Sequence, residues 1–321
     1  GIIECDVTFT KDGHLVCRHA ECDLHTTTNI VATDLNQFCT RPWTQGGPEP
    51  RCCASDLYLS QFKELTGKMD ARDANATTAE EYLGGTADWR TDLYTGRGTL
   101  LTHAQSIELI RKLGGKYTPE LKSGDPMRIA EVFGSQEAYA RKLIDEYEAA
   151  GISPKKVWQQ SFNVEDVLYW IDNTKYGKQA VYLLDYSATL DDIVIQSPYN
   201  ATDRTEYFKM LNKRGVRIIA PPMPALLSVT SSGKIVPSKL AKDLRRWGFR
   251  IITWTFERSD VRQGASKAGY YYDFDPTGAA IKKDSDMYKA LDVLAKKVKV
   301  IGIFTDWPAT VTYYANCMGL E

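Results

Sequence analysis

The chain opens with Gly1-Ile2-Ile3-Glu4-Cys5-Asp6-Val7-Thr8-Phe9-Thr10-Lys11-Asp12-Gly13, and one residue later it continues Leu15-Val16-Cys17-Arg18-His19. The apolar pair Ile2 and Ile3 and the β-branched Val7 predict a buried strand over residues 2–7. Successive side chains of a strand point to opposite faces, so Glu4 and Asp6 must share one face. The opening stretch therefore predicts a pair of carboxylates on one side of a buried strand.

Two carboxylates on a buried strand are costly unless a cation or hydrogen bonds compensate them. Hard oxygen ligands of this kind suit Mg²⁺ or Ca²⁺. His19 follows on a second extended segment, after the Lys-Asp-Gly turn, which can bring an imidazole beside such an ion. Taken alone, the same residues also describe a surface strand with two acids and a solvent-exposed histidine. Both interpretations stay open at this point.

Length and composition narrow the class of protein. A chain of 321 residues fits one α/β barrel. With 40 basic and 41 acidic residues, nothing points to nucleic acid or an anionic membrane as a partner, and a small-molecule substrate is expected. No apolar run approaches the roughly 18 residues of a membrane-spanning helix.

Seven cysteines are many for a cytosolic enzyme, and they favour a secreted, extracellular protein. Four of them cluster in one loop-rich stretch: Cys22, Cys39, Cys52 and Cys53. We expect disulfides there rather than a zinc site, because the spacing lacks paired C-x-x-C knuckles. Since the count is odd, at least one thiol is free, and Cys317 is the candidate. The glycosylation sequons at Asn75 and Asn200 add modest support for secretion.

Short apolar runs alternate with helical patterns along the chain, which predicts a parallel α/β sheet. The expected helices end at a glycine in most cases, the usual stop signal. We count seven strand–helix units, one fewer than a closed (β/α)₈ barrel needs. The expected strands are 2–7, 116–121, 157–162, 180–186, 216–221, 250–255 and 299–305, and the expected helices are 106–113, 129–150, 164–176, 207–214, 240–247 and 309–318.

Residues 1–321 are expected to form a single domain with two insertions. The first, at about 20–101, holds the clustered cysteines. The second, 258–284, carries the aromatic run Tyr270-Tyr271-Tyr272-Asp273-Phe274. That aromatic run either packs its own loop or forms a wall beside a substrate. Both insertions follow strands of the predicted barrel, and the carboxyl ends of such strands build the active sites of barrel enzymes.

Several short motifs together resemble the glycerophosphodiester phosphodiesterase family, most closely its secreted fungal members. They occur in the family's order over nearly the whole chain, so the ordered set is specific although each motif alone is weak. The matching stretches are I-E-C-D-V-x-x-T-K-D-G at 3–13, L-V-C-R-H at 15–19, L-H-T-T-T-N at 24–29, T-P-E-L-K at 118–122, Q-S-F at 160–162, I-T-W-T at 252–255 and G-I-F-T-D-W-P at 302–308.

The resemblance implies a TIM-type (β/α) barrel and the metal-dependent hydrolysis of glycerophosphodiesters to glycerol 3-phosphate and an alcohol. It implies a divalent cation, Ca²⁺ or Mg²⁺, on Glu4, Asp6 and Glu120. By the period of two, Lys122 shares a strand face with Glu120, and the resemblance gives it a catalytic and substrate-binding charge. His19 is then the acid–base catalyst, and Trp254 binds substrate.

Two departures from the family's pattern matter. The His-Arg-Gly strand with which the family's barrel begins has no counterpart, so we expect the first β–α unit to be missing and the activity of this chain to suffer. Ala20 stands where the family has an aspartate, and Asp23 or Glu21 could replace that carboxylate. Two other functions remain open: a sphingomyelinase D-like phospholipase, and a non-catalytic or truncated family member that binds phosphodiester ligands.

Overall fold

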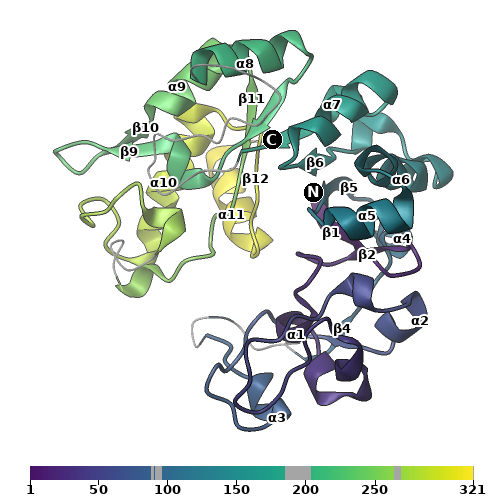
Figure 1. Ribbon diagram of the computed structural model, residues 1–321. Coiled ribbons are helices and arrows are strands. Elements are labelled where there is room, and N and C mark those ends of the chain that lie inside the picture. The colour runs from purple at the N-terminus through teal and green to yellow at the C-terminus, as the bar shows by residue number, and fades with distance from the viewer. Residues whose placement is uncertain (88–89, 91–95, 185–203, 264–268, 321) are drawn as a thin grey trace. The chain divides into compact units, whose positions relative to one another are not determined.

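The computed structural model describes residues 1–87, 90, 96–184, 204–263 and 269–320. The described chain divides into two compact units. Gly1–Ser161 and Asp172–Gln179 form the first unit, and Phe162–Ile171 and Ala180–Glu321 form the second. Each unit is an α/β structure with mostly parallel strands (Figure 1). The expectation of a single domain remains a prediction.

Four strands build the sheet of the first unit, in the order β6-β5-β1-β2. β1 (Ile2–Phe9) pairs in parallel with β5 (Lys116–Leu121), and β5 pairs in parallel with β6 (Gln160–Ser161). β2 (Leu15–Cys17) returns antiparallel to β1 through the expected turn, in which Gly13 has a φ of 78°. The strands predicted at 2–7 and 116–121 are thus confirmed. The expected burial of Ile2 and Ile3 is wrong, because this end of β1 is exposed and burial begins at Cys5.

Helices α4 (His103–Lys112), α5 (Pro126–Phe133) and α6 (Gln136–Ala149) accompany this sheet (Figure 1). The single helix predicted for 129–150 is wrong, because the chain breaks between α5 and α6. Gly134 ends α5 with a φ of 86°, and the Ser135 hydroxyl accepts the Ala138 N–H to begin α6. A glycine stop followed at once by a serine N-cap is the physical reason for two helices.

The first insertion has a hydrophobic core of its own, which the sequence did not reveal. Its regular elements are short: α1 (Leu24–Thr27), α2 (Leu59–Phe62), α3 (Ala79–Tyr82), β3 (Thr66–Gly67) and β4 (Gly98–Thr99). Buried apolar side chains, among them Leu24, Ile30, Leu57, Phe62 and Leu100, pack together between them. The insertion is therefore a packed layer rather than an open loop.

Three disulfides form, and all of them lie in the first unit. Cys22 pairs with Cys53 and Cys39 pairs with Cys52, which confirms the expectation for the cysteine cluster. The third, between Cys5 and Cys17, joins β1 to β2 and was not foreseen. Cys317 is the free thiol, as expected.

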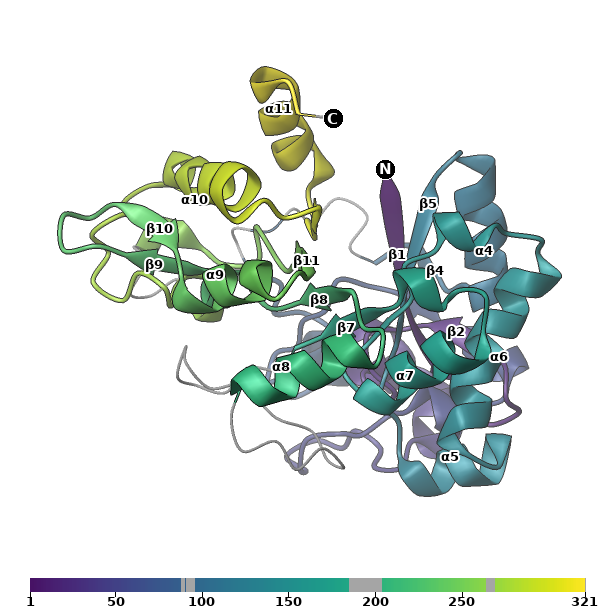
Figure 2. The same cartoon turned by 90° about the horizontal axis from the view of Figure 1, so that it is seen from above.

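In the second unit, four strands follow one another in the order β7-β8-β11-β12, and the pairs between them are parallel. The strands are shorter than predicted, and the end of the range 180–186 lies outside the described residues. A hairpin of β9 and β10 lies beside α10 (Figure 2). The elements are β7 (Val181–Leu183), β8 (Ile218–Ala220), β9 (Leu227–Val229), β10 (Ile235–Pro237), β11 (Arg250–Thr253), β12 (Gly302–Ile303), α7 (Val164–Asn173), α8 (Arg204–Lys213), α9 (Lys239–Arg246), α10 (Met287–Val293) and α11 (Pro308–Met318).

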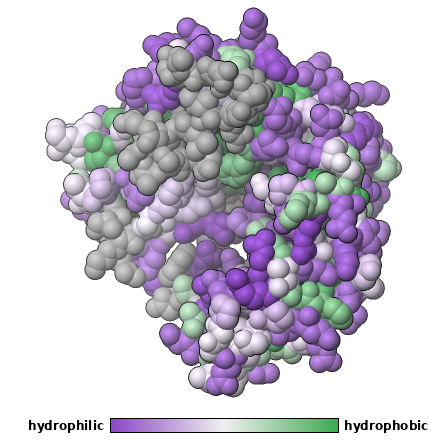
Figure 3. Space-filling view, in the orientation of Figure 1, coloured by the Kyte–Doolittle hydropathy of each residue, from purple (hydrophilic) through white to green (hydrophobic). Residues whose placement is uncertain are grey.

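The visible face of the described chain is mostly polar, in keeping with the balanced charge (Figure 3). The face shown in Figure 3 is mostly hydrophilic, with hydrophobic residues in scattered groups. Within the described residues, no helix combines the length and apolarity that crossing a membrane requires.

The core of the insertion predicts a difference between two of its phenylalanines. Phe62 is fully buried, whereas Phe38 is 46% exposed. Phe62→Ala is expected to lower the free energy of unfolding by about 3–5 kcal/mol, and Phe38→Ala by about 0.5 kcal/mol or less. Urea unfolding followed by circular dichroism measures both. Equal effects would contradict the packed core.

Candidate active site

The parallel register of β1 and β5 brings three carboxylates together. Asp6 stands opposite Glu120, and Glu4 stands opposite Thr118 two residues earlier. One oxygen atom from each of Glu4, Asp6 and Glu120 lies within 4.8 Å of the others. Glu120 is buried, Asp6 is half-buried and Glu4 is exposed, so the cluster opens toward solvent at one end. Three hard oxygen donors at this spacing fit one divalent cation.

Lys122 lies directly against these carboxylates. Its Nζ is 2.6 Å from Glu120 Oε1 and 3.7 Å from Asp6 Oδ1. Burial by itself would lower the pKa of Lys122, but the charges of Glu120 and Asp6 outweigh it and raise that pKa above its usual value. Lys122 therefore stays positively charged beside the cluster.

Glu120 has a strongly perturbed pKa. Its burial raises its pKa to about 7, with a further contribution from Asp6, although the Lys122 charge acts in the opposite direction. Lys122 thus faces Glu120 and Asp6, and the Arg18 guanidinium also acts on Asp6. A bound cation would add positive charge to this group of three carboxylates.

Gln160 belongs to the cluster as well, and sequence reasoning gave it no role. It stands opposite Glu120 on the neighbouring β6, and its Nε2 donates a 2.7 Å hydrogen bond to Glu4 Oε1. The side chain is buried, and its Oε1 has no hydrogen-bond partner within the part of the chain that the structure describes. The Gln160-Ser161-Phe162 motif was the signal that could have placed it. An unpaired amide oxygen beside carboxylates fits the donor chemistry of a cation site.

His19 lies just beyond β2, and its side chain is exposed. The residue before it, Arg18, donates its backbone N–H to the Asp6 carbonyl oxygen at 2.9 Å. This hydrogen bond ties the residue before His19 to β1, the strand that carries Glu4 and Asp6. The other histidines lie elsewhere: His14 in the turn, His25 in the insertion and His103 at the start of α4.

Asp23, rather than Glu21, lies against the His19 segment. Asp23 Oδ2 accepts the Ala20 backbone N–H at 3.1 Å, and its carboxylate faces the Arg18 guanidinium. Glu21 instead accepts the Ser55 hydroxyl and the Asp125 N–H, which tie it to the insertion and to α5. Of the two acids suggested by sequence, Asp23 has the contacts of a residue that supports the His19 segment.

Trp254 belongs to the second unit, directly after β11. Its Nε1 donates to the Ala220 carbonyl oxygen at 2.9 Å, and its ring contacts Phe162, Tyr270 and Tyr271. Tyr272, by contrast, is buried and packs against Phe274, so this part of the aromatic run packs its own loop, and a wall beside a substrate stays a prediction. The role of Trp254 in binding substrate stays a prediction.

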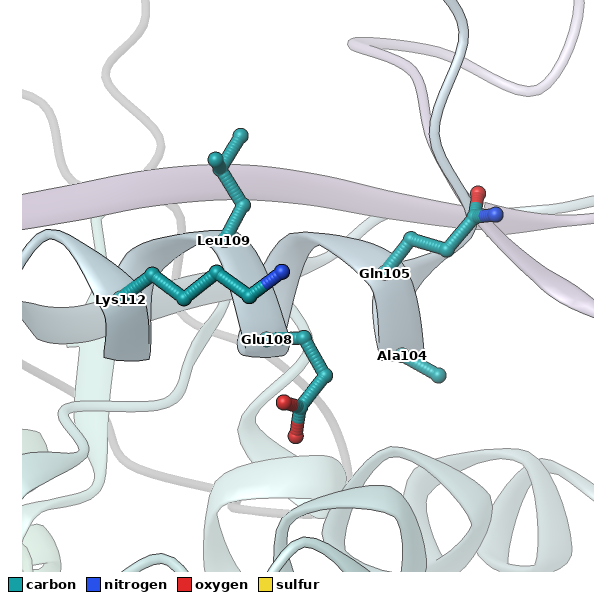
Figure 4. Close-up of a pocket in the computed structure, with 5 residues that line it drawn as sticks. All are labelled: Ala104, Gln105, Glu108, Leu109 and Lys112. Atoms are coloured by element: carbon teal, nitrogen blue, oxygen red, sulfur yellow. The ribbon is translucent and has the colours of Figure 1, made fainter.

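A shallow pocket on α4 is not part of this cluster. Figure 4 shows that its lining comes from one face of that helix, through Ala104, Gln105, Glu108, Leu109 and Lys112. None of these residues belongs to the carboxylate cluster. We therefore assign the candidate site to the carboxylates of β1 and β5.

Fold and cluster together define an α/β protein with a candidate centre for a divalent cation. The family model for the glycerophosphoryl diester phosphodiesterase family matches residues 1–310. The chain belongs to this family. It is also 41% identical over 255 residues to an "Extracellular protein" of Arthroderma benhamiae, covering 78% of this chain and all of that protein.

Solved structures of low identity share the fold. A protein from Silicibacter pomeroyi, described as a glycerophosphoryl diester phosphodiesterase, has a TM-score of 0.59 at 15% identity and covers 99% of this chain and 84% of its own. An Oleispira antarctica phosphodiesterase, solved with its product sn-glycerol-3-phosphate, has a TM-score of 0.52 at 13% identity, covering 98% and 85%. They confirm the TIM-type α/β fold expected from sequence.

The environment of Asp23 predicts a pH dependence of stability. Burial raises its pKa to about 6, against the effects of Arg18 and the Ala20 N–H. A carboxyl whose pKa is raised on folding contributes stability below its unfolded pKa, near 4, and that contribution is lost as the pH rises to about 6. The free energy of unfolding of the native protein minus that of Asp23→Asn should fall by up to about 3 kcal/mol between pH 4 and 7.

Urea unfolding of both proteins at several pH values measures this difference, which cancels the titration of all other groups. Asp34→Asn serves as the control, because Asp34 is exposed in the same insertion. A difference that is flat or rises with pH would contradict the buried carboxyl.

Proposed function

We propose that the protein is a metal-dependent phosphodiesterase that hydrolyses glycerophosphodiesters to glycerol 3-phosphate and an alcohol. The observation that carries the proposal is the cluster of Glu4, Asp6 and Glu120 with Lys122 against it. Family membership supports the reaction class. The product found in the Oleispira antarctica phosphodiesterase supports the kind of substrate.

Glu4, Asp6 and Glu120 would hold a divalent cation, Ca²⁺ or Mg²⁺, through carboxylate oxygens. When bound, such an ion neutralises phosphate charge and activates a nucleophile. Gln160 orients Glu4 through its amide hydrogen bond, and this contact keeps the exposed member of the set in place.

Lys122 would bind the phosphoryl oxygens. Its raised pKa keeps the ammonium charged at neutral pH, and its place beside Glu120 and Asp6 fixes the charge at the edge of the cluster. A fixed positive charge stabilises the negative charge that develops on the phosphoryl group in the transition state.

His19 would move the protons. Phosphodiester cleavage requires a proton to leave the nucleophile and another to reach the departing alkoxide, and an imidazole suits either step near neutral pH. The side chain of His19 is exposed, so a substrate can reach it from solvent. The backbone N–H of the preceding residue, Arg18, donates to the Asp6 carbonyl oxygen, and this hydrogen bond limits how far His19 can lie from β1.

We also infer that the protein acts outside the cell. Three disulfides and the relative from Arthroderma benhamiae support this location. Asn75 is exposed in a polar loop, where a glycan would fit, whereas Asn200 lies outside the described residues.

Turnover of glycerophosphocholine with added Ca²⁺ or Mg²⁺ tests the proposed function. His19→Ala should lower kcat by about 10²- to 10⁴-fold, because an acid–base group is lost. Glu4→Ala should raise the metal concentration needed for activity. His14→Ala is the matched control and should leave kcat unchanged, since that histidine lies in the β1–β2 turn.

No turnover by the native chain despite bound metal would instead identify a non-catalytic family member. Hydrolysis of sphingomyelin in place of glycerophosphocholine would favour the sphingomyelinase D-like activity. Either outcome would overturn the proposal.

Replacement of Lys122 should change catalysis and metal binding in opposite directions. Lys122→Gln should lower kcat/KM by about 10²- to 10³-fold, because a charge on the phosphoryl group is lost. The same change should tighten metal binding, because Lys122 no longer competes for Glu120 and Asp6. Lys116→Gln, on the same strand but exposed, is the control. Weaker metal binding in Lys122→Gln would contradict the arrangement.

A further inference from the structure

The unforeseen disulfide joins the two segments that carry the candidate site. Cys5 lies between Glu4 and Asp6 on β1, and Cys17 ends β2, two residues before His19. Because side chains alternate along a strand, Cys5 points away from the face that holds the two carboxylates. The bond therefore links carboxylate strand and histidine segment without occupying the site itself.

Only a short ladder connects these segments otherwise. The antiparallel register runs from Phe9–Leu15 to Val7–Cys17, and it ends there. Beyond it, a single backbone hydrogen bond, from the Arg18 N–H to the Asp6 carbonyl oxygen, continues the contact. In the register, Cys17 stands opposite Val7, but its disulfide goes to Cys5, two residues earlier on β1. The disulfide therefore connects the segments beyond the last strand pair, at the residue between Glu4 and Asp6.

The residues around His19 are fixed, while its own side chain is exposed. On one side, Arg18 donates through its guanidinium to the Thr27 carbonyl and hydroxyl oxygens at 3.2 and 3.0 Å. On the other side, Ala20 donates to Asp23. The backbone of a residue sets where its side chain begins, so the covalent tie at Cys17, two residues before His19, acts on the placement of the imidazole.

We propose that the Cys5–Cys17 disulfide is a positioning element that holds His19 beside the carboxylates of β1. This rests on the proposed function, in which His19 transfers protons. The disulfide touches neither substrate nor metal. Its effect passes through the placement of His19, since misplacement of a catalytic group by about 1 Å can cost on the order of 10²-fold in rate.

A double-mutant cycle tests the proposal. The disulfide is removed by Cys5→Ser with Cys17→Ser, in the native background and in His19→Ala. Cys39→Ser with Cys52→Ser is the matched control, because its sequence separation of 13 is nearly that of Cys5 and Cys17, which is 12. Loops of similar length should cost similar stability when opened, so only the positioning effect differs.

Loss of Cys5–Cys17 should lower kcat by about 10- to 100-fold, and the control pair should change it by less than about twofold. His19→Ala should then cost much less in the background without the disulfide than in the native protein. Fully additive effects, or equal losses from the two disulfides, would overturn the proposal. If the serine pair does not fold, Cys5→Ala with Cys17→Val keeps an apolar contact and gives the same test.

A second readout does not depend on activity. Mn²⁺ bound at the carboxylates should broaden the His19 imidazole signals in the NMR spectrum of the native protein, because paramagnetic broadening falls steeply with distance. Without Cys5–Cys17 the broadening should weaken while the Mn²⁺ affinity stays within about threefold. Unchanged broadening would contradict positioning. Absence of turnover with the broadening lost as expected would count against the proposed function only.

Discussion

The parallel pairing of β1 with β5 is the constraint on which the site depends. These strands lie far apart in sequence, with the whole insertion between them, and their register sets Asp6 opposite Glu120. A slip by one residue would turn Glu120 to the other face of the sheet and disperse the carboxylates. Tyr139 of α6 supports the pairing, since its hydroxyl donates to the Val7 carbonyl oxygen at 3.0 Å.

The cluster is held at an energetic disadvantage that a cation would relieve. Burial raises the pKa of Glu120, although Lys122 lies against both Glu120 and Asp6. Gathering carboxylates at a partly buried place is costly, and a divalent cation would offset that cost. Perturbed ionisable groups of this kind concentrate at functional sites. The gathering of three carboxylates therefore accounts for the raised pKa of Glu120 and supports the proposed metal site.

Much of the site could be predicted from sequence, because it depends on local periodicity. The period of two places Glu4 with Asp6 and Glu120 with Lys122, whatever the rest of the fold does. Gln160 escaped notice because its role depends on β6 lying next to β5 in register, which no local pattern reveals. The Cys5–Cys17 bond was missed for the same reason, since it follows from the antiparallel return of a strand of only three residues.

The fold shows the same division between local and long-range information. Alternating strands and helices predicted the α/β class, and glycine stops located most helix ends. The apolar spacing of residues 129–150 continues across Gly134 and therefore predicts one helix. In the structure, Gly134 ends α5 and the Ser135 N-cap begins α6. The core of the insertion depends on contacts among residues as distant as Val16 and Leu100, which composition alone cannot indicate.

The most direct test of the account is a calorimetric titration of metal-free protein with Ca²⁺ and with Mg²⁺. The account predicts one ion per chain, and a loss of affinity of about 10- to 100-fold or more in Asp6→Asn, because a direct ligand is removed. Asp12→Asn, in the turn after β1, should bind as the native protein does. Binding by Asp6→Asn with native affinity, or no binding by the native protein, would contradict the central claim that these carboxylates form a metal centre.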